Sequence, residues 1–348
     1  MQVFPLITRF PVSLTGGRSV RVAFPGRRGV GGGFSLIELL VAFAVLALMA
    51  VLMLSLVSST QSIWRQTTSR TEQFREARRA FERISQRLSQ ATLNVYWDYV
   101  NSAGQPRTTN NAATFEPARY ARFSELRYLQ TNAAALPAPR GGQLRSQAVF
   151  FQAALGKTVN TNLTPLNSLL NTVGYFIEQG DDSLLKPAFV PGTRTRYRLF
   201  EMVEPSEDLE LYRVTSGSPF SGSSTWFTVP LGERKNSHRL ADNIVALVLG
   251  AVYEQNNATV TNFAYQSTPA AGGTQPPEAN NLPPSVRVSM VALDEPSARR
   301  VQDSGLNLPN ATDDNSLAEL EEFLRENSLN YRRFESSIPI ASSKWSTE

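Results

Sequence analysis

One carboxylate in this sequence stands where an ionised group is costly. Glu38 is the first acidic residue of the 348-residue chain, and 16 uninterrupted apolar residues, 39–54, follow it directly. A carboxylate within a bilayer costs on the order of 2.5–3.5 kcal/mol at the midplane and less near the interface, so it calls for a partner. The chemistry that Glu38 predicts is therefore ion pairing with another group.

The apolar run predicts a helix that crosses a membrane. Residues 34–57 are 24 largely apolar residues, which as an α-helix span about 36 Å, against a hydrocarbon core of about 30 Å. Residues 1–33 contain five arginines and no acid. By the positive-inside rule these arginines place the N-terminus in the cytoplasm, and everything after residue 57 is expected on the other side.

Two ordinary alternatives exist for this segment. Small residues near Val57 and Ser59 fit the cleavage site of a secretory signal peptide. A helix that is never processed would instead be a simple membrane anchor. The apolar run is longer than the core of a typical signal peptide, and Glu38 lies in its first turn, so both features favour a membrane helix with a further role.

Ten residues at the start of the helix match a processing motif. Residues 33–42, GFSLIELLVA, resemble the cleavage and methylation motif of type IV prepilins and type II secretion pseudopilins. The resemblance implies that residues 1–33 are a leader, that a prepilin peptidase cuts after Gly33, and that the new amino group of Phe34 becomes methylated. It also implies that Glu38 pairs with the Phe34 ammonium of a neighbouring pilin or pseudopilin subunit. Such a pair relieves two charges that are each costly in an apolar bundle.

An amphipathic helix is predicted to continue from the membrane helix through residues 58–97. Neither glycine nor proline occurs between Phe34 and Ala103, and apolar residues recur at alternating steps of three and four. The stripe consists of Phe74, Ala77, Phe81, Ile84, Leu88, Ala91 and Val95. We expect this stripe to be buried under strands.

The positive charge of the chain is concentrated in the leader. A pI near 9.4 would by itself indicate an acidic partner such as nucleic acid. Without the five leader arginines, the count of Lys and Arg falls from 34 to 29, against 30 Asp and Glu. Five arginines of the amphipathic helix, at positions 75, 78, 79, 83 and 87, have glutamates between them, which predicts a solvated face. Nucleic acid is therefore not expected as a partner.

Residues 98–348 predict one α+β head, in which an antiparallel β-sheet with long loops packs against the long helix. Short β-type runs alternate with stretches rich in Asn, Gly and Pro. The predicted strands are 148–153, 173–178, 197–203, 210–214, 244–253 and 285–293. The predicted loops are 101–115, 155–172, 216–224 and 255–284, and a short charged surface helix is predicted at 317–329.

The head also resembles known families. Its size, its long loops and the segment LPPSVRV at 282–288 are similar to the J-type minor pseudopilins of type II secretion. Residues 73–82, 88–99 and 174–178, with Asp181 and Asp182, are more closely similar to the Verru_Chthon cassette protein C family. That family implies a set of pilin-like sibling proteins but no settled activity.

The sequence offers little for catalysis or for cofactor binding. It contains no cysteine, which excludes thiol catalysis, disulfides and thiolate metal sites. The single histidine, His238, lies in a polar run without the partners of a Ser/His/Asp relay or a metal site. Asp181–Asp182 and Asp313–Asp314–Asn315 offer oxygen ligands for calcium, but neither has the spacing of a calcium loop. We therefore expect no catalytic residue, no metal and no cofactor.

Four aromatic residues leave two interpretations open. Tyr96, Trp97, Tyr99 and Trp226 would form a face for a partner or a glycan if they are exposed. Because Trp97 closely follows the helix stripe, we expect it to be buried where the helix meets the head.

These observations together predict a minor pilin or pseudopilin in the bacterial inner membrane. It would assemble into a type IV pilus-like or type II secretion pseudopilus filament, with the head in the periplasm or in an extracellular filament. The large head favours a minor or tip position, because bulky loops would crowd an array of identical subunits. The alternative is a surface adhesin or DNA-uptake module that the pilin machinery only delivers.

Overall fold

The computed structural model describes residues 35–183, 185–212, 224–233, 236–269 and 275–346. The chain divides into two compact units, Met1–Gln61 and Ser62–Glu348. The boundary falls inside helix α1, which begins at Leu36 and ends at Leu88. In the first unit the described residues are Ser35 and the N-terminal part of α1, and all the described strands belong to the second unit.

A five-stranded antiparallel sheet carries the buried centre of the second unit. Its strands follow chain order, so each one pairs with the next. They are β3 (Tyr128–Asn132), β4 (Gln143–Ala154), β5 (Leu170–Gly180), β6 (Arg196–Glu204) and β7 (Ser237–Asp242). Both faces are buried, since Val149 and Phe151 of β4 join one core cluster and Phe150 between them joins another. Helix α2 (Thr225–Glu233) covers the second face with Trp226 and Phe227.

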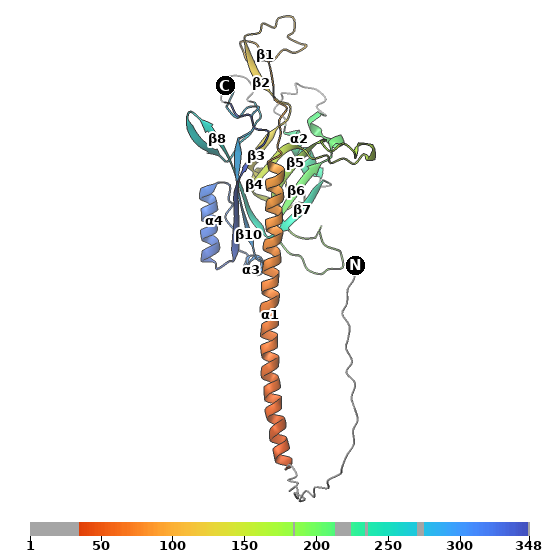
Figure 1. The fold of residues 1–348 in the computed structure, drawn as a ribbon, viewed down its shortest axis with the longest axis vertical. Coiled ribbons are helices and arrows are strands. Elements are labelled where there is room, and N and C mark those ends of the chain that lie inside the picture. Colours follow the sequence, from red (N-terminus) through yellow and green to blue (C-terminus); the bar gives the residue numbers. More distant parts are fainter. Residues whose placement is uncertain (1–34, 184, 213–223, 234–235, 270–274, 347–348) are drawn as a thin grey trace, which may run out of the picture. The chain divides into compact units, whose positions relative to one another are not determined.

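A four-stranded antiparallel sheet stands beside it, in the strand order β11-β10-β8-β9. The strands are β8 (Ile244–Gln255), β9 (Ala258–Asn262), β10 (Ser285–Leu293) and β11 (Tyr331–Pro339). Two helices follow β10, α3 (Glu295–Asp303) and α4 (Asp314–Glu326), and α4 lies along the outer side of this sheet (Figure 1). The buried leucines Leu317, Leu320 and Leu324 fix α4 to the main core cluster.

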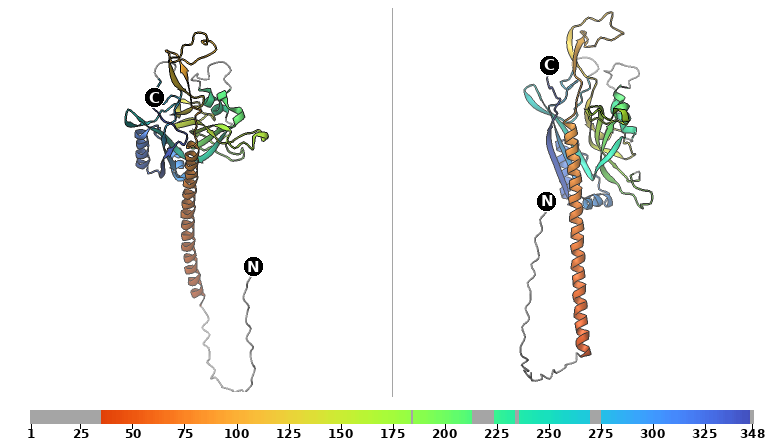
Figure 2. Two further views of the ribbon diagram at one scale, coloured as in Figure 1. Left: turned by 45° about the horizontal axis from the view of Figure 1, so that its top comes forward. Right: turned by 45° about the vertical axis from the view of Figure 1, so that its right-hand side comes forward.

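The C-terminal part of α1 packs against both sheets. Its residues Ala77, Ala80, Phe81, Ile84 and Leu88 are buried in the cluster that also contains side chains of β4, β5, β8 and β10. Figures 1 and 2 show this part of the helix between the β10 side and the β6–β7 side of the second unit. The spacing of three and four therefore buries one face of the helix under strands from Ala77 to Leu88, as expected. Val95, the last residue of the predicted stripe, lies beyond the helix and is exposed, so the prediction is wrong there.

Polar side chains join the two sheets. The Ser146 hydroxyl accepts a hydrogen bond from the Leu247 N–H at 2.9 Å and donates to the Leu247 carbonyl at 2.8 Å. Gln147 accepts from the Leu249 N–H at 2.6 Å, and Gln130 donates to the Leu249 carbonyl at 3.2 Å. Ser146 reaches β8 because the β4–β5 register shifts between Arg145 and Val149, and Ser146 there has φ 61°. Strand β9 pairs only with residues 251–255 of β8, so these side chains satisfy backbone groups that no strand reaches.

A two-stranded hairpin extends beyond the two larger sheets. It consists of β1 (Tyr96–Val100) and β2 (Arg119–Phe123), paired antiparallel and connected by a long loop. The three views agree that it projects from the second unit at the end away from α3 (Figures 1 and 2).

The prediction that the helix continues through residues 58–97 is wrong at its C-terminal end, because α1 ends at Leu88. Ala91 instead forms a bridge to Ala153 of β4, which buries it as effectively as a helical position would. The C-terminal segment binds the end of α1, since the Ala341 N–H donates to the Ser89 carbonyl at 3.1 Å and the Ser342 hydroxyl donates to the Ala91 carbonyl. Contacts with residues some 250 positions away therefore stop the helix.

Five of the six predicted strands are confirmed as parts of β4, β5, β6, β8 and β10. The sixth, 210–214, is wrong over its described residues, since Glu210–Tyr212 is a 3₁₀ turn. The remaining 3₁₀ turns that the structure describes are Ala133–Ala135, Thr161–Leu163 and Ser206–Asp208. The predicted helix 317–329 exists but begins three residues earlier, because Asp313 and Ser316 form a capping box before its first turn.

Candidate functional site

Glu38 lies in the first turn of α1 and takes part in its N-terminal cap. Its carboxylate accepts a hydrogen bond from the Ser35 N–H at 3.0 Å, and the Ser35 hydroxyl accepts one from the Glu38 N–H at 3.2 Å. This reciprocal arrangement is a capping box, which satisfies two of the unpaired N–H groups at a helix start. The carboxylate is exposed, so the cap leaves it open to a further partner.

The helix that follows Glu38 presents an apolar surface on every side. Every side chain from Leu36 to Gln61 is exposed, and this stretch of 26 residues is long and apolar enough to cross a membrane. Apolar area of this extent is unfavourable in water at about 25 cal/mol per Å². The segment is therefore a candidate membrane span.

The predicted processing residues, Gly33 and Phe34, lie outside the described residues, as does the leader. The structure thus describes Glu38, the predicted assembly residue, but not the expected scissile bond.

The arginine-rich face of α1 has a structural role at its C-terminal end. Arg83 and Arg87 both approach the buried Glu201 of β6, at 2.7 and 3.4 Å. The Tyr175 hydroxyl donates to the same carboxylate at 2.7 Å. Burial, together with the charge of Glu201, raises the pKa of Tyr175 well above its usual range and keeps this hydroxyl protonated. These two arginines therefore hold α1 on the sheet and are not a free basic surface.

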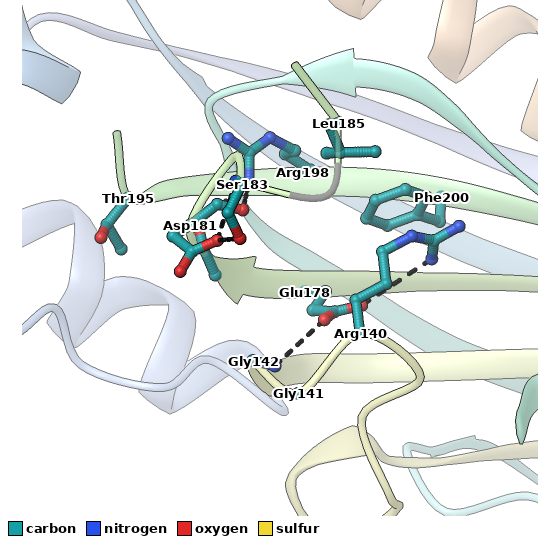
Figure 3. Close-up of a pocket in the computed structure, with 11 residues that line it drawn as sticks. Arg140, Gly141, Gly142, Glu178, Asp181, Ser183, Leu185, Thr195, Arg198 and Phe200 are labelled. Atoms are coloured by element: carbon teal, nitrogen blue, oxygen red, sulfur yellow. Dashed lines mark hydrogen bonds and ion pairs between the residues drawn. The ribbon is translucent and has the colours of Figure 1, made fainter. Parts of the chain in front are cut away.

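A pocket of about 290 Å³ opens at one end of the five-stranded sheet (Figure 3). Two arginines, Arg140 and Arg198, and two acids, Glu178 and Asp181, are among the residues that line it. Glu178 accepts from the Gly142 N–H at 3.2 Å and lies 3.9 Å from Arg140, whose guanidinium lies over the Phe200 ring. Gly142 has no room for a side chain, since a Cβ there would lie 2.3 Å from the Gln179 carbonyl oxygen. The pocket is polar, and no excess of one charge marks it for an ionic ligand.

Arg198 places a positive charge among backbone carbonyls of the β5–β6 loop. It donates to the carbonyls of Gly180 and Asp181 at 2.9 and 3.0 Å and to that of Arg194 at 3.3 Å (Figure 3 shows Arg198 beside Asp181). A guanidinium that already binds these oxygens leaves them unavailable to calcium.

The aspartates that were considered as calcium ligands accept hydrogen bonds from backbone N–H groups. Asp181 accepts from Ser183, and Asp182 accepts from the Arg194 N–H at 2.9 Å. These hydrogen bonds lower the pKa of both carboxyls. Asp313 likewise caps α4 through the Ser316 N–H at 2.8 Å, which lowers its pKa. Within the part of the chain that the structure describes, no three carboxylate or imidazole groups are arranged to hold a metal.

His238 is exposed on the edge strand β7, opposite Glu201 in the β6–β7 register. It lies on the surface, as its polar surroundings in the sequence suggested.

The prediction that Trp97 is buried is wrong. Trp97 is 53% exposed on β1, while Trp226 is buried under the sheet. Tyr96 and Tyr99 are also exposed, and Tyr120 of β2, which sequence reasoning did not single out, is exposed beside them. The signal that could have found the hairpin is the enrichment of Tyr96–Val100 and Arg119–Phe123 in aromatic residues, which are common in strands.

Fold and site together define an α+β protein whose N-terminal helix carries a glutamate at the head of a segment able to span a membrane. Comparison of the chain with protein-family models, with curated proteins and with solved structures gave no match.

Proposed function

We propose that this chain is a minor pilin or pseudopilin subunit, which is cleaved after Gly33, N-methylated at Phe34 and assembled into a type IV pilus-like or type II secretion pseudopilus filament. The observation that carries the proposal is the position of Glu38. It is an exposed carboxylate in the first turn of a helix whose next 16 residues are all apolar.

The two requirements of this helix have one common solution. Its apolar surface needs lipid or neighbouring helices, and its carboxylate needs a cation in that same apolar environment. A bundle of identical or related helices meets both needs, because the ammonium of Phe34 from one subunit neutralises Glu38 of the next. Either charge alone would be costly, and together they offset their desolvation.

The partners follow from this scheme. A prepilin peptidase would process the chain, other pilin or pseudopilin subunits would surround its helix, and the bacterial inner membrane would hold it before assembly. The head would then lie in the periplasm or in an extracellular filament. An α+β head with antiparallel sheets is compatible with this layout, and its size and projecting hairpin favour a minor or tip position.

The first experiment is mass spectrometry of the native N-terminus. The proposal predicts a chain that begins at methylated Phe34. An intact leader would favour a simple anchor, and a start near Thr60 would favour a secretory signal peptide, so either result would overturn the proposal.

The second experiment separates two roles of Glu38, the helix cap and the charge. Glu38→Gln keeps a side chain that can complete the capping box but removes the charge. Glu38→Ala removes both, and Ser35→Ala removes the hydroxyl that accepts the Glu38 N–H but leaves the carboxylate. The proposal predicts that Glu38→Gln and Glu38→Ala insert normally but fail to enter filaments, whereas Ser35→Ala assembles. Normal assembly of Glu38→Gln would mean that the glutamate only caps the helix.

The alternative, an adhesin or DNA-uptake module that uses the pilin machinery for delivery, depends on the head. Two of the α1 arginines, Arg83 and Arg87, are not available to its DNA-binding form, since they are committed to Glu201. Salt-sensitive binding of duplex DNA by the full-length chain would favour it over assembly alone.

A further inference from the structure

Three aromatic rings share one face of the β1–β2 hairpin. Directly opposite residues of an antiparallel pair lie on the same face, and the register places Trp97 opposite Arg122 and Tyr99 opposite Tyr120. Trp97, Tyr99 and Tyr120 are 53%, 45% and 58% exposed. The face that they form with Arg122 is called the aromatic face below.

Two residues on the opposite face of the hairpin are buried. Val100 and Phe123 are buried, and the alternation of strand residues places both on the side away from the aromatic face. The register therefore separates the three exposed rings from these two buried side chains.

The side chains of the aromatic face are held in place by one another. The Tyr99 and Tyr120 rings lie 4.3 Å apart between centroids, and their hydroxyls are hydrogen-bonded at 2.6 Å. The Arg122 guanidinium lies 5.5 Å from the centre of the Trp97 ring and donates to the carbonyl and hydroxyl of Ser346 at 3.2 and 3.0 Å. Rings held in this way lose little conformational freedom when a ligand covers them.

The surroundings of the aromatic face are polar and almost neutral. Residues 96–123 contain three arginines and two acids, which is a weak basic excess compared with the charged groove that a nucleic-acid strand needs. Eight of the 14 residues of 101–114 carry an amide or a hydroxyl. Ser102, Thr109 and Asn110 among them are exposed.

We propose that the aromatic face binds a neutral polysaccharide. A pyranose ring has a face of C–H groups, which carry partial positive charge and stack on the electron-rich face of an aromatic ring. Its edge of hydroxyls needs donors and acceptors, which the tyrosine hydroxyls and the amide-rich loop provide. The rings contact the apolar face of the sugar, and the loop binds its rim.

This binding goes beyond assembly into a filament and does not depend on it. The filament proposal concerns Phe34 and Glu38, whereas the polysaccharide site involves the hairpin alone. A processed and assembled chain that binds no polysaccharide, or an unprocessed chain that binds one, would separate the two proposals.

The test uses the full-length chain, purified in a detergent without a sugar headgroup so that the detergent does not compete. The probes are insoluble cellulose, chitin and cross-linked amylose, with heparin and single-stranded oligonucleotide resins as the charged alternatives. Retention on at least one neutral polysaccharide is expected. It should persist when salt is raised from about 0.05 to about 0.5 M, because no ion pair contributes.

The variants address each end of the aromatic face. Trp97→Val and Tyr120→Val remove a ring but keep a β-branched residue that suits a strand, and each should weaken retention about tenfold. Phe189→Val is the matched control, since Phe189 is an aromatic residue of the β5–β6 loop with 84% exposure. Its retention should equal that of the unmodified chain. Circular dichroism and the unfolding temperature establish that each variant is folded.

Three results would overturn the proposal. They are no retention on any of the neutral polysaccharides, unchanged retention of folded Trp97→Val and Tyr120→Val, and binding that is confined to the heparin or oligonucleotide resin.

Discussion

Arg83 of helix α1 and Glu201 of strand β6 form a bidentate ion pair across 118 residues of sequence. The Arg83 Nε lies 2.9 and 3.0 Å from the two carboxylate oxygens, and its terminal nitrogen lies 2.7 Å from Oε2. The Glu201 side chain is 2% exposed, whereas that of Arg83 is 48% exposed. The carboxylate is therefore buried in the head, and the helix brings the cation that neutralises it.

Removal of Arg83 should destabilise the head. Arg83→Met keeps the aliphatic stem but leaves a buried carboxylate with fewer donors, so the free energy of unfolding should fall by about 3 kcal/mol. Arg78→Met is the matched control, because the Arg78–Glu82 pair on the same helix is exposed at both ends and should contribute less than about 1 kcal/mol. Urea unfolding followed by tryptophan fluorescence measures both. Equal effects of the two substitutions would contradict a special role for Glu201.

Glu295 should make the stability of the head depend on pH in the acidic range. Burial alone would raise the pKa of this carboxyl, but hydrogen bonds from Arg299, Asn243 and Arg196 outweigh it and lower the pKa to about 2, from an ordinary 4.5. Because the pKa is lower in the folded state, the stabilisation is present above pH 4.5 and is lost as the pH falls towards 2. Glu295 also accepts from Gln73 of α1, so its protonation should loosen the helix from α3.

The check is a comparison of unfolding free energies between the unmodified chain and Glu295→Gln at several pH values. The difference should be greatest above pH 4.5 and should narrow as the pH approaches 2. The exposed Glu326, changed to Gln, serves as the control and should leave the pH profile unaltered. A difference that stays constant over this range would contradict the assignment.

Gly174 lies where adjacent strands leave no room for a side chain. A Cβ at this position would lie 2.7 Å from two ring atoms of Phe150 and 3.2 Å from the Met202 methyl group. Gly174→Ala should therefore lower the free energy of unfolding by about 1–3 kcal/mol through overpacking. Gly232→Ala offers the opposite case, because nothing lies within 4 Å of that site in helix α2, and it should be neutral or stabilising by up to about 1 kcal/mol. Denaturant unfolding of the two variants is the measurement, and Gly174→Ala should have the lower midpoint.

Gln147 should be sensitive to loss of its amide. Besides accepting from Leu249, it donates to the carbonyls of Phe263 and Thr312 at 2.7 and 2.6 Å. Gln147→Leu would leave these buried groups unsatisfied, at a cost of about 2–4 kcal/mol in unfolding free energy. Gln143→Leu, at the exposed start of the same strand, should change stability by less than about 0.5 kcal/mol. Similar values for the two variants would argue against the joining role of Gln147.

The strands that sequence reasoning found are those buried on both faces. The period-two alternation of residues 285–293 after Pro283 and Pro284 predicts a strand with the bounds that β10 has, although both of its faces are buried and not the one expected. The edge strands β3, β7, β9 and β11 were missed, since an edge strand tolerates sequences such as SHRLAD and YRRFESSIP. The predicted loop 255–284 is therefore wrong at β9. The end of α1 was missed for another reason, namely that the backbone of the C-terminal segment stops it.

The candidate site was predictable in part. Glu38 stands out in the sequence because the cost of an ionised group in an apolar run follows from the local sequence and does not depend on tertiary contacts. The Arg83–Glu201 pair and the exposed Trp97 depend on which strand lies beside which, and no local pattern carries that information. Trp97 was assigned to the core on the assumption that the helix continued, so one error in a helix boundary caused the other.

The edge of strand β8 that β9 does not cover affects how the chain aggregates. A strand with free backbone groups along one edge is a template on which a foreign strand can add. Between Leu247 and Leu249 these groups are occupied by the side chains of Ser146, Gln147 and Gln130. A side chain that hydrogen-bonds to this edge presents no backbone groups of its own for a further strand. No additional strand can therefore pair at this stretch. Even at high local concentration of the chain, this stretch is therefore protected from intermolecular β-sheet aggregation.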